Sequence, residues 1–560
     1  MPTRARRGAL AVLCLLLACA SQARASVGDV VTLDGPAPEL LELGGVAMAA
    51  DGTGGLVYRR VDDGHPHVFA ARFDGRRWHP PQRVDAGQRF DSAWPCIGAA
   101  GGGRLVVAWA QDGGDGLDSL WAAALPRGRG RFLAPTLVDF TIGEDRATYP
   151  SIATSPAGAA LLTYRVIRSF ANPTLPAGYV AGEVRLARFD GSRWQRLGVP
   201  ANRDRAAPQR FPRAENAPRV ALDASGNGAV AWSEPDDDFV DRVWVRRVFG
   251  TRLGVPLAAS PLRADGRLVR GAADAFDVAE NDLGRVVVAF RQLPDPGDPA
   301  GAPRVYVNEL QDAESGSGTR FDGPELVAAG AVGVPGVTLA GRDDALLAFA
   351  RGGAAALAYR PAPGPFALAD LDSPALPAPA PLAVAGASGR NVLAAATEGG
   401  GGEVAVQELD ATTTLSARPL YTAFGGAVRE LALAGSGAGD ALVAFAQGAD
   451  GDRQIAAAVV DAPPAPFALT PSSWSRARRP RLSWSAASDV LGPVTYVVWV
   501  DGRPVARTRA TRFAFPRGAL AQGAHRVRVV AHDGAGQRTV AGTARLRLDR
   551  AGRSRVTVRR

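Results

Sequence analysis

The sequence predicts an all-β protein in which a ring of repeated four-stranded sheets is followed by a smaller β-sandwich. One pattern recurs eight times between residues 44 and 445, and its periodicity stops near residue 462. The chain holds 66 glycines and 42 prolines in 560 residues, which favours a turn-rich fold with more than one domain. No long helical periodicity follows the N-terminus. We therefore expect the ring over residues 29–462 and the sandwich over residues 463–550.

Eight segments align without gaps and share two positions. The segments are 44–58, 95–109, 150–164, 218–232, 276–290, 335–349, 381–395 and 431–445. The last residue is aromatic in all but Ala395, namely at Tyr58, Trp109, Tyr164, Trp232, Phe290, Phe349 and Phe445. Six residues earlier, all but Asp343 are glycine, namely Gly52, Gly103, Gly158, Gly226, Gly284, Gly389 and Gly439.

The spacing of the copies indicates the kind of ring. Successive copies end 46 to 68 residues apart, which matches one four-stranded blade of a β-propeller. Eight copies predict an eight-bladed β-propeller followed by a β-sandwich. A seven-bladed ring with one degenerate unit is the alternative.

The sequence of each unit predicts short strands joined by tight turns. In "PRVALDASGNGAVAW" (218–232) two apolar runs flank a turn whose Gly226 can adopt positive φ. The oxygens of Asp223, Ser225 and Asn227 do not recur in the other copies, so this turn is not a calcium loop. The Asp-Gly turns "FDGRRW" (73–78) and "FDGSRW" (189–194) predict hairpins between third and fourth strands.

The two ends of the repeat region predict how the ring closes. The third strand of the eighth unit, at 453–461, is followed by a proline-rich segment rather than by a fourth strand. An apolar run at 29–35 has no partner in its own unit. Pairing of that run with the eighth unit would close the ring and remove its exposed edges.

The repeat resembles the secreted β-propellers of actinobacteria and, more distantly, sialidase-like and kelch-like propellers. This resemblance covers residues 29–462 and implies an architecture rather than an activity. The sialidase Asp-box pattern S-x-D-x-G-x-x-W is incomplete, because Phe189 precedes Asp190 and the upstream serine is absent. The chain also lacks a phosphate-binding loop, a dinucleotide fingerprint, a G-x-S-x-G elbow and a CxxC pair, so no cofactor is expected.

The first 25 residues read as an export signal. Three arginines precede an apolar run at 9–20, and a small-x-small cleavage motif ends at Ala25. The alternative is lipidation at Cys19, because "LLAC" resembles a lipobox. No other stretch is long and apolar enough to span a membrane. The protein is therefore expected to be secreted, with attachment to the cell envelope or a lipoprotein form as alternatives.

The C-terminal part breaks the repeat and changes the charge. Alternating strands over residues 463–550, with Trp484 and Tyr496 as core residues, resemble a fibronectin type III or other Ig-like module. Residues 461–560 hold 19 arginines against 5 aspartates and no glutamate, and residues 551–560 are expected to form a basic tail. We expect this module to bind an anionic cell-wall polymer through Arg476, Arg478, Arg479 and Arg481. The alternative is codon bias, because all 64 basic residues are arginine.

The candidate binding residues of the propeller lie in the loops of one face. The loops between second and third strands carry acids, of which Asp112, Asp115, Asp236, Asp237, Asp238 and Asp241 are the candidates. The loops that lead into the blades add Trp94 and Tyr149, each directly before a proline. Acids with aromatics suit a sugar, a cation or a basic peptide. His65-Pro66-His67 offers two metal ligands without a third nearby, so no metal site is expected.

These patterns favour a secreted, non-catalytic binding protein of the cell envelope, and a monomer. Its propeller face would recognise an extracellular glycan, a cation or an envelope protein, and its basic module would attach to anionic polymer. No intracellular nucleic acid and no catalytic residue are expected. The alternative is a glycan-active enzyme, a sialidase-like hydrolase or a lyase, that uses carboxylates of the acidic face. A structural or adhesion protein is a third possibility.

Overall fold

The computed structural model describes residues 25–558 with short internal gaps. The gaps are 115–117, 142–144, 169–174, 176, 204–207, 262, 265–266, 299–300, 312–319, 340–343, 361–363, 371–381, 388–389, 398–402, 411–415, 425–427, 450 and 477–478. The chain divides into two compact units. The propeller unit holds Ala25–Ala462 with Ser488–Val494, and the sandwich unit holds Pro463–Ala487 and the chain from Thr495 onward. The predicted signal segment and Cys19 lie outside the described residues.

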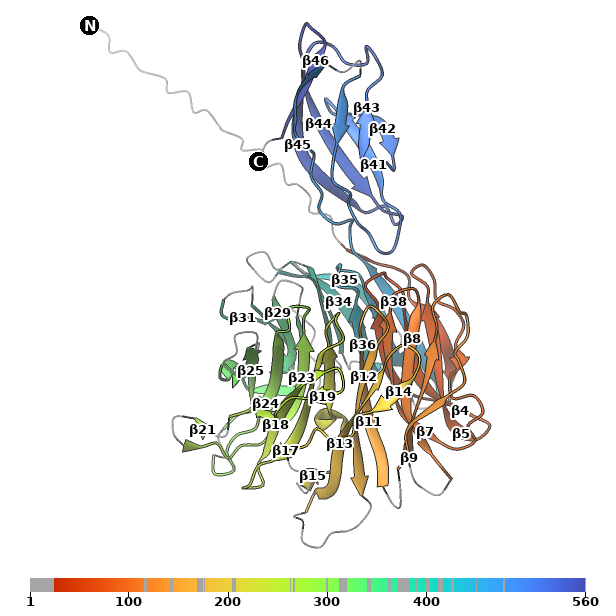
Figure 1. The fold of residues 1–560 in the computed structure, drawn as a ribbon, viewed down its shortest axis with the longest axis vertical. Coiled ribbons are helices and arrows are strands. Elements are labelled where there is room, and N and C mark those ends of the chain that lie inside the picture. The colour runs from red at the N-terminus through yellow and green to blue at the C-terminus, as the bar shows by residue number, and fades with distance from the viewer. Residues whose placement is uncertain are drawn as a thin grey trace, which may run out of the picture. The chain divides into compact units, whose positions relative to one another are not determined.

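The first four sheets of the propeller unit are antiparallel and follow one another along the chain (Figure 1). The first two hold β3 (Leu40–Met48), β4 (Gly54–Asp62), β5 (His65–Phe73) and β6 (Gln82–Arg83), then β7 (Ser92–Ala100), β8 (Arg104–Asp112), β9 (Asp118–Leu125) and β10 (Thr136–Asp139). The third holds β11 (Asp145–Thr154), β12 (Ala160–Arg168), β13 (Tyr179–Phe189), β14 (Trp194–Arg196) and β15 (Pro208–Arg210). The fourth holds β16 (Arg219–Leu222), β17 (Gly228–Pro235), β18 (Asp241–Phe249), β19 (Arg252–Leu253) and β20 (Leu257–Ala258).

Four further sheets continue the same pattern. The fifth and sixth hold β23 (Ala273–Glu280), β24 (Val286–Gln292), β25 (Arg304–Gln311), β26 (Arg320–Phe321) and β27 (Glu325–Ala329), then β28 (Ala331–Leu339), β29 (Ala345–Arg351), β30 (Ala354–Arg360) and β31 (Ala367–Asp370). The seventh holds β32 (Leu382–Ala387), β33 (Arg390–Thr397), β34 (Glu403–Asp410) and β35 (Ser416–Phe424). The eighth holds β36 (Val428–Gly435), β37 (Ala441–Gln447) and β38 (Arg453–Asp461), completed by β1 (Ser26–Val27) and β2 (Val31–Ala37).

The first strands of the sheets form a closed ring. β3 contacts β7, and the contacts continue through β11, β16, β23, β28 and β32 to β36, which contacts β3 again. β1 and β2 pair with β38, so the predicted closure by the N-terminal run is confirmed. The chain is therefore an all-β protein with a β-propeller. A small hairpin of β21 (Arg263–Ala264) and β22 (Arg267–Leu268) and the short 3-10 helix η1 (Ala214–Asn216) complete the described elements of this unit.

The two repeated positions have the physical roles that the pattern predicts. The seven closing aromatics, from Tyr58 to Phe445, lie in the second strands and are at most 1% exposed. The turn glycines that the structure describes adopt positive φ, for example 81° at Gly52 and 83° at Gly226, and Gly389 lies outside the described residues. In the turn 223–227 the backbone N–H of Gly226 donates to the carbonyl of Asp223 at 3.1 Å. This stretch is a hairpin turn between β16 and β17.

The Asp-Gly turns also form the predicted hairpins, and their tryptophans pack between blades. Phe73 and Trp78 have ring centroids 5.3 Å apart, and Phe189 and Trp194 have centroids 5.1 Å apart. Trp78 packs with apolar residues of the eighth sheet, and Trp194 packs with those of the second. These two tryptophans therefore belong to the core.

The sandwich unit is built on two antiparallel sheets. The larger sheet has the order β39 (Ser472–Arg476), β46 (Arg553–Val558), β45 (Arg538–Leu548), β44 (Gly523–His532), β41 (Thr495–Val500) and β42 (Arg503–Thr508). The smaller sheet pairs β40 (Arg481–Ser483) with β43 (Arg512–Ala514). Trp484 and Tyr496 are buried with ring centroids 5.5 Å apart. Residues 553–558, expected as part of a basic tail, form β46 instead, because Val556 is buried on the core face of the sheet.

Helices play little part in the described chain. None of them is both long and apolar enough to cross a lipid bilayer.

Candidate functional site

The inner strands of the propeller are interrupted at a common level. Register shifts mark β-bulges in β3, β7, β11, β23, β28 and β36, each near the closing aromatic of the partner strand. A bulge bends its strand and redirects a side chain, and bulges are frequent beside binding sites. The first strands of the sheets surround the axis of the ring. The bulges in these strands therefore redirect side chains toward that axis.

Trp94 and Tyr149 occupy two neighbouring bulges. Both have left-handed backbone angles, with φ of 49° and 47°, and each precedes a proline. Such angles are costly for a bulky residue and are found where a local geometry is functionally constrained. The two rings stack with centroids 4.8 Å apart and planes 30° apart. The loop position expected for these residues is wrong: they lie inside β7 and β11, because the chain resumes pairing immediately after the bulge.

A cavity of about 520 Å³ lies against these bulges, and we call it the central cavity. Its walls come from β3, β7, β11 and the segment 214–219. Trp94 and Tyr149 form an aromatic wall, and Glu42 and Arg219 contribute charged groups. This combination of an aromatic surface and a few polar groups is typical of a small-molecule or sugar site.

The two charged groups of the central cavity are held by different neighbours. Glu42 Oε1 lies 3.2 Å from Arg59 Nε, and Arg59 Nη1 donates to the carbonyl of Ser92 at 3.1 Å. Arg219 Nη2 donates to the carbonyl of Ala214 at 3.0 Å. Burial lowers the pKa of Arg219, and the charge of Asp277 opposes this effect. A carboxylate and a guanidinium therefore both border the cavity.

A second carboxylate lies near Glu42. Glu430, in the bulge of β36, accepts a hydrogen bond from the backbone N–H of Leu43 at 2.5 Å through Oε2. Burial raises the pKa of Glu430, and the negative charge of Glu42 raises it further. The backbone N–H of Leu43 and the charges of Arg453 and Arg59 oppose the rise. Two carboxyl groups, of Glu42 and Glu430, therefore lie on neighbouring sheets, and the charge of one acts on the other.

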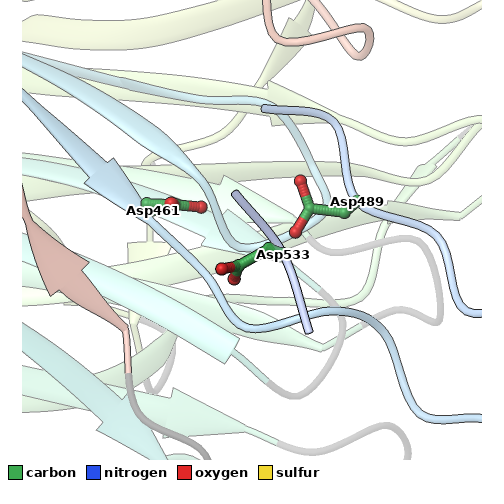
Figure 2. Close-up of side chains that lie close together, drawn as sticks. All are labelled: Asp461, Asp489 and Asp533. Carbon is green, nitrogen blue, oxygen red and sulfur yellow. The ribbon is translucent and has the colours of Figure 1, made fainter. Parts of the chain in front are cut away.

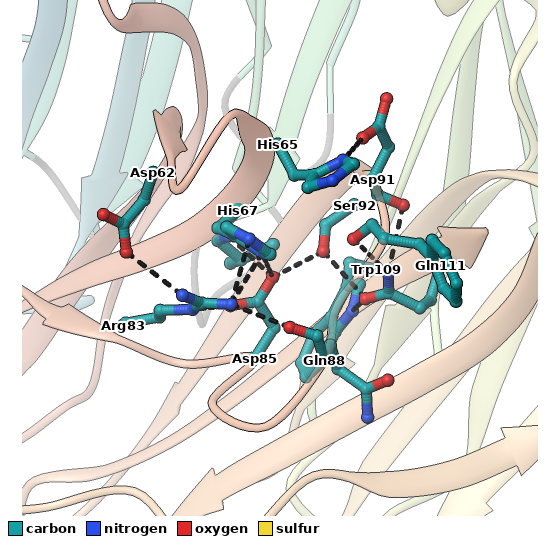
Figure 3. A network of polar contacts seen from close by, with 12 residues as sticks. Asp62, His65, His67, Arg83, Asp85, Gln88, Asp91, Ser92, Trp109 and Gln111 are labelled. Atoms are coloured by element: carbon teal, nitrogen blue, oxygen red, sulfur yellow. Dashed lines mark hydrogen bonds and ion pairs between the residues drawn. The ribbon is translucent and has the colours of Figure 1, made fainter. Parts of the chain in front are cut away.

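The segment that leads into Trp94 is fixed by a buried polar network (Figure 3). Ser92 Oγ lies 2.5 Å from Asp85 Oδ2 and 2.8 Å from Gln111 Oε1. Gln111 Nε2 donates to the carbonyls of Phe90 at 2.6 Å and Asp91 at 3.1 Å. Ser92 and Asp85 are fully buried. This network joins the first and second sheets and includes Ser92, two residues before Trp94.

The histidines of the predicted His65-Pro66-His67 pair are also part of this network. His67 Nδ1 lies 2.9 Å from Asp85 Oδ2, and Arg83 Nη2 lies 2.9 Å from His67 Nε2. His65 Nδ1 pairs with Asp91 Oδ1 at 2.8 Å (Figure 3). These nitrogens are occupied within the fold.

Asp112, the predicted acid of the second blade that the structure describes, does not line the central cavity. Asp112 ends β8 and accepts the backbone N–H of Gly114 at 2.7 Å through Oδ1. Asp115 lies outside the described residues. At the start of β9, burial raises the pKa of Asp118 to about 6, the charges of Asp112 and Asp91 raise it further, and Arg146 opposes them.

The predicted acids of the fourth blade are largely engaged with arginines. Asp236 Oδ2 accepts a hydrogen bond from Arg242 Nε at 2.8 Å, and Oδ1 accepts the backbone N–H of Asp238 at 3.0 Å. Asp237 Oδ1 lies 2.9 Å from Arg203 Nη2. Buried Asp241 pairs with Arg210 at 2.5 Å and accepts the hydroxyl of Tyr179 at 3.2 Å. None of these acids lines the central cavity.

The basic candidates of the sandwich unit are spread over two sheets. Arg476 ends β39, where its backbone pairs in register with Arg553. Arg478 lies outside the described residues. Arg479 is exposed in the chain that follows, and exposed Arg481 begins β40.

A pair of carboxylates is also found near the end of the last propeller strand (Figure 2). Asp461 ends β38, and Asp489 lies in the short segment 488–494 of the same unit. A carboxylate oxygen of Asp461 lies within 4.8 Å of one of Asp489. Asp533 belongs to the sandwich unit, where its Oδ1 accepts the backbone N–H of Gln537 at 2.8 Å. Both propeller aspartates have interactions within the fold.

Sequence reasoning identified Trp94 and Tyr149 but not Glu42, Arg219 or Glu430. A signal for the bulges was nonetheless present in the repeat. The residue before the first aligned position is Leu43, Trp94, Tyr149, Ala217, Ala275, Val334, Ala380 or Glu430, and the next residue is a proline in five of the eight copies. This position of the alignment lies near the bulges. A comparison of the eight copies at this position would have identified Glu430 as a candidate site residue.

Comparisons with known proteins find no matching protein-family model and no matching curated protein. Solved structures with a similar fold include a Dyadobacter fermentans protein of unknown function, at 14% identity and TM-score 0.38, covering 66% of this chain and 94% of that one. An intramolecular trans-sialidase from Ruminococcus gnavus matches at 10% identity and TM-score 0.36, covering 66% and 95%. A polysaccharide lyase, an ulvan lyase, matches at 10% identity and TM-score 0.40, covering 77% and 94%. At these TM-scores the likenesses carry no argument about activity, and the fold rests on the sheet pairing described above.

Proposed function

We propose that the propeller unit is a non-catalytic saccharide-binding module whose binding site is the central cavity. The observation that carries the proposal is the stacked pair of Trp94 and Tyr149, held by left-handed backbone angles in two adjacent bulges. Two aromatic rings that only packed the core would not require strained backbone angles at the same level of two neighbouring sheets.

The chemistry of the cavity suits a sugar. Its volume of about 520 Å³ lies within the range of ordinary ligand pockets. The flat aromatic wall offers a surface for the C–H face of a pyranose ring, and Glu42 and Arg219 can accept and donate hydrogen bonds to its hydroxyl groups. The buried network of Ser92, two residues before Trp94, supports this wall, as a preorganised site requires.

A glycan-active enzyme is the second candidate, and Glu430 is the observation that favours it. Burial raises the pKa of this carboxyl while Glu42 lies near enough to act on it electrostatically. Hydrolysis of a glycosidic bond uses two carboxyl groups, one protonated and one ionised. In this reading Glu430 would be the general acid and Glu42 the carboxylate that assists the reaction.

The other parts of the chain complete the proposal. The N-terminal 25 residues would direct secretion, with lipidation at Cys19 as the alternative. The sandwich unit, of fibronectin type III or Ig-like kind, would attach the protein to an anionic cell-wall polymer at the envelope. The segment with Arg476, Arg478, Arg479 and Arg481 is the attachment site that the sequence suggests.

A glycan array on the purified full chain tests the saccharide site. The wild type should bind a restricted set of glycans, and Trp94→Gly should lose that signal, because glycine accepts a φ of 49° but removes the ring. Phe140→Ala is the control, since Phe140 is 62% exposed and lies outside the central cavity. Equal binding by wild type and Trp94→Gly would refute the site. Release of free sugar by the wild type, lost in Glu430→Gln, would establish the enzyme instead.

A further inference from the structure

The larger sheet of the sandwich unit has an exposed face rich in arginine. Strands β44, β45 and β46 alternate between buried apolar residues and exposed polar ones. The buried side chains, such as Val527, Leu546 and Val556, face the core. The exposed set on the opposite face includes five arginines: Arg526, Arg528, Arg545, Arg547 and Arg555. We call these five residues the arginine face.

The strand register sets these arginines directly opposite one another. Arg526 pairs with Arg545 between β44 and β45, and Arg547 pairs with Arg555 between β45 and β46. Like charges at directly opposite positions of a sheet destabilise it. Two such pairs on one face are therefore an electrostatic cost that the folding of the unit does not explain.

Within the described residues, the carboxylate beside the arginine face has other partners, because Asp501 accepts the backbone N–H of Arg526 at 2.8 Å and pairs with His525 at 2.7 Å. None of the five guanidinium groups of the arginine face forms an ion pair within those residues, whereas Arg553 on the same β46 strand pairs with Asp549 at 2.6 Å. The nearest aromatic partner is Trp499 on β41, whose ring lies 4.5 Å from the guanidinium carbon of Arg528. The face thus presents several cations that form no ion pair among the described residues, and a second exposed ring of the sheet, Trp474, lies 5.8 Å from the guanidinium carbon of Arg553.

We propose that the arginine face binds a linear anionic polysaccharide, such as a polyuronate. Neighbouring arginines are spaced by about 5 Å across strands and about 7 Å along them, so a chain with repeated carboxylates can meet several guanidinium groups at once. Guanidinium groups bind carboxylates through paired hydrogen bonds, and an added anion relieves the repulsion between Arg526 and Arg545.

A nucleic acid is the less suitable occupant. Single-stranded nucleic acid is bound by aromatic side chains on which successive bases stack, together with a basic groove. Two rings of this sheet, Trp499 and Trp474, are each partly covered by a guanidinium group, of Arg528 and of Arg553 respectively, so neither offers a free stacking surface. The face is a twisted sheet surface rather than a groove. A polymer whose charges alone carry the contact fits it better.

This proposal deepens the attachment role of the sandwich unit and rests on it, but it does not depend on the central cavity. It also moves the attachment site. The arginine face lies on β44, β45 and β46, whereas the segment that the sequence suggested lies on β39, on β40 and between them. The two sites can therefore be tested by separate substitutions.

The test is binding of polygalacturonate to the full chain by biolayer interferometry, with neutral dextran as the reference polymer. The double variant Arg526→Gln/Arg545→Gln should bind polygalacturonate at least tenfold more weakly than the wild type. Wild-type binding should also weaken steeply between about 50 and 200 mM salt, because exposed charges are screened. The matched control Arg512→Gln/Arg517→Gln removes the same charge from exposed positions off the face and should bind as the wild type does.

Each other outcome overturns a defined part of the proposal. Absence of wild-type binding to polygalacturonate would refute the attachment role as a whole. Equal loss in the control double variant would refute the face, since only net charge would matter. Loss in Arg479→Gln/Arg481→Gln without loss in the face variant would return the site to the sequence-predicted segment. A single-stranded oligonucleotide that bound more tightly than polygalacturonate and lost its binding in the Arg526→Gln/Arg545→Gln variant would identify nucleic acid, rather than a polysaccharide, as the ligand of the arginine face.

Two further readouts separate folding and the saccharide site from this result. The face variant should melt no lower than the wild type, because it removes a repulsive pair. Trp94→Gly should keep full binding of polygalacturonate while it loses its array glycan. Loss of polygalacturonate binding in Trp94→Gly would contradict the independence of the two sites.

Discussion

Arg242 of the propeller unit and Arg526 of the sandwich unit have opposite surroundings. Arg242 is 2% exposed and pairs with Asp236, and its remaining donors reach the carbonyls of Pro261, Val269 and Gly271. Arg526 is exposed and lies opposite Arg545. The fold neutralises Arg242, whereas it aligns Arg526 with a second arginine. The pairing anchors Arg242 in the fold, and the alignment of Arg526 with Arg545 is the basis of the binding role proposed above.

The energetic reason lies in desolvation. A buried guanidinium must recover its lost hydration through fixed hydrogen bonds, so Arg242 holds the loop between the fourth and fifth sheets in place. An exposed guanidinium stays hydrated and stabilises little by itself. The comparison therefore predicts large stability effects in the propeller unit and small ones on the arginine face.

Substitution of the paired arginine should have the largest effect. Arg242→Gln leaves the carboxylate of Asp236 without its partner and frees loop carbonyls, and it should lower the free energy of unfolding by about 3–5 kcal/mol. Urea unfolding measures the change. Arg252→Gln, at the exposed first residue of β19, is the control and should change it by less than about 0.5 kcal/mol. Equal effects of the two substitutions would contradict the claim that the paired Arg242 stabilises the fold more than an exposed arginine does.

Removal of an unfavourable propeller charge should have the next largest effect. The pKa of Asp118 is raised from 3.8 to about 6, so its ionisation disfavours the folded state. Wild-type stability should fall as pH rises from about 4 through 6, and Asp118→Asn should lose that dependence. The full difference corresponds to about 3 kcal/mol, and solvent screening at this partly exposed carboxyl reduces it to about 1 kcal/mol.

The measurement for Asp118 is the melting temperature at pH 4 and pH 7. Asp118→Asn should melt higher than the wild type at pH 7 and close to it at pH 4. A variant that melts lower at pH 7 would show that this carboxylate is stabilised by the fold.

Relief of a repulsive pair should have a smaller effect of opposite sign. Arg526→Thr removes one guanidinium of the pair with Arg545, and it should raise the free energy of unfolding by about 0.2–1 kcal/mol at low salt. The gain should shrink at 0.5 M salt because the repulsion is screened. Destabilisation at low salt would mean that the arginine face supports the fold, and the comparison would fail.

The smallest stability effect is expected at the aromatic wall. Trp94→Gly loses ring packing but relieves a left-handed angle, so the free energy of unfolding should change by no more than about 1 kcal/mol. A tryptophan that served only the core would cost about 3–5 kcal/mol when truncated. Calorimetric melting distinguishes the two cases.

The fold was predictable because burial and backbone angle determine which residues occupy the repeated positions. Phe290 and Phe445 close the repeat because the second strands that hold them are buried, and Gly226 marks a turn that needs positive φ. The pairing of residues 31–37 with β38 followed from an apolar run that had no local partner. These features depend on burial and on backbone angles, and short stretches of the sequence are enough to indicate both.

The site was only partly predictable, because its geometry depends on partners far away in the chain. Trp94-Pro95 reads as a loop signal, and only the register with β8 reveals a bulge. The acid Asp241 reads as a surface ligand, although Arg210 pairs with it 31 positions earlier in the chain. The alternation in "RSRVTV" (553–558) was a strand signal that the high arginine content concealed.

The central claim is that the stacked rings of Trp94 and Tyr149 form the saccharide platform. Isothermal titration calorimetry of the strongest array glycan, run on the wild type, Trp94→Gly and Tyr149→Gly, tests it most directly. Loss of one stacking ring is worth about 1.4 kcal/mol or more, so each variant should raise Kd at least tenfold while its melting temperature stays near that of the wild type. A Kd unchanged in both variants would contradict the account.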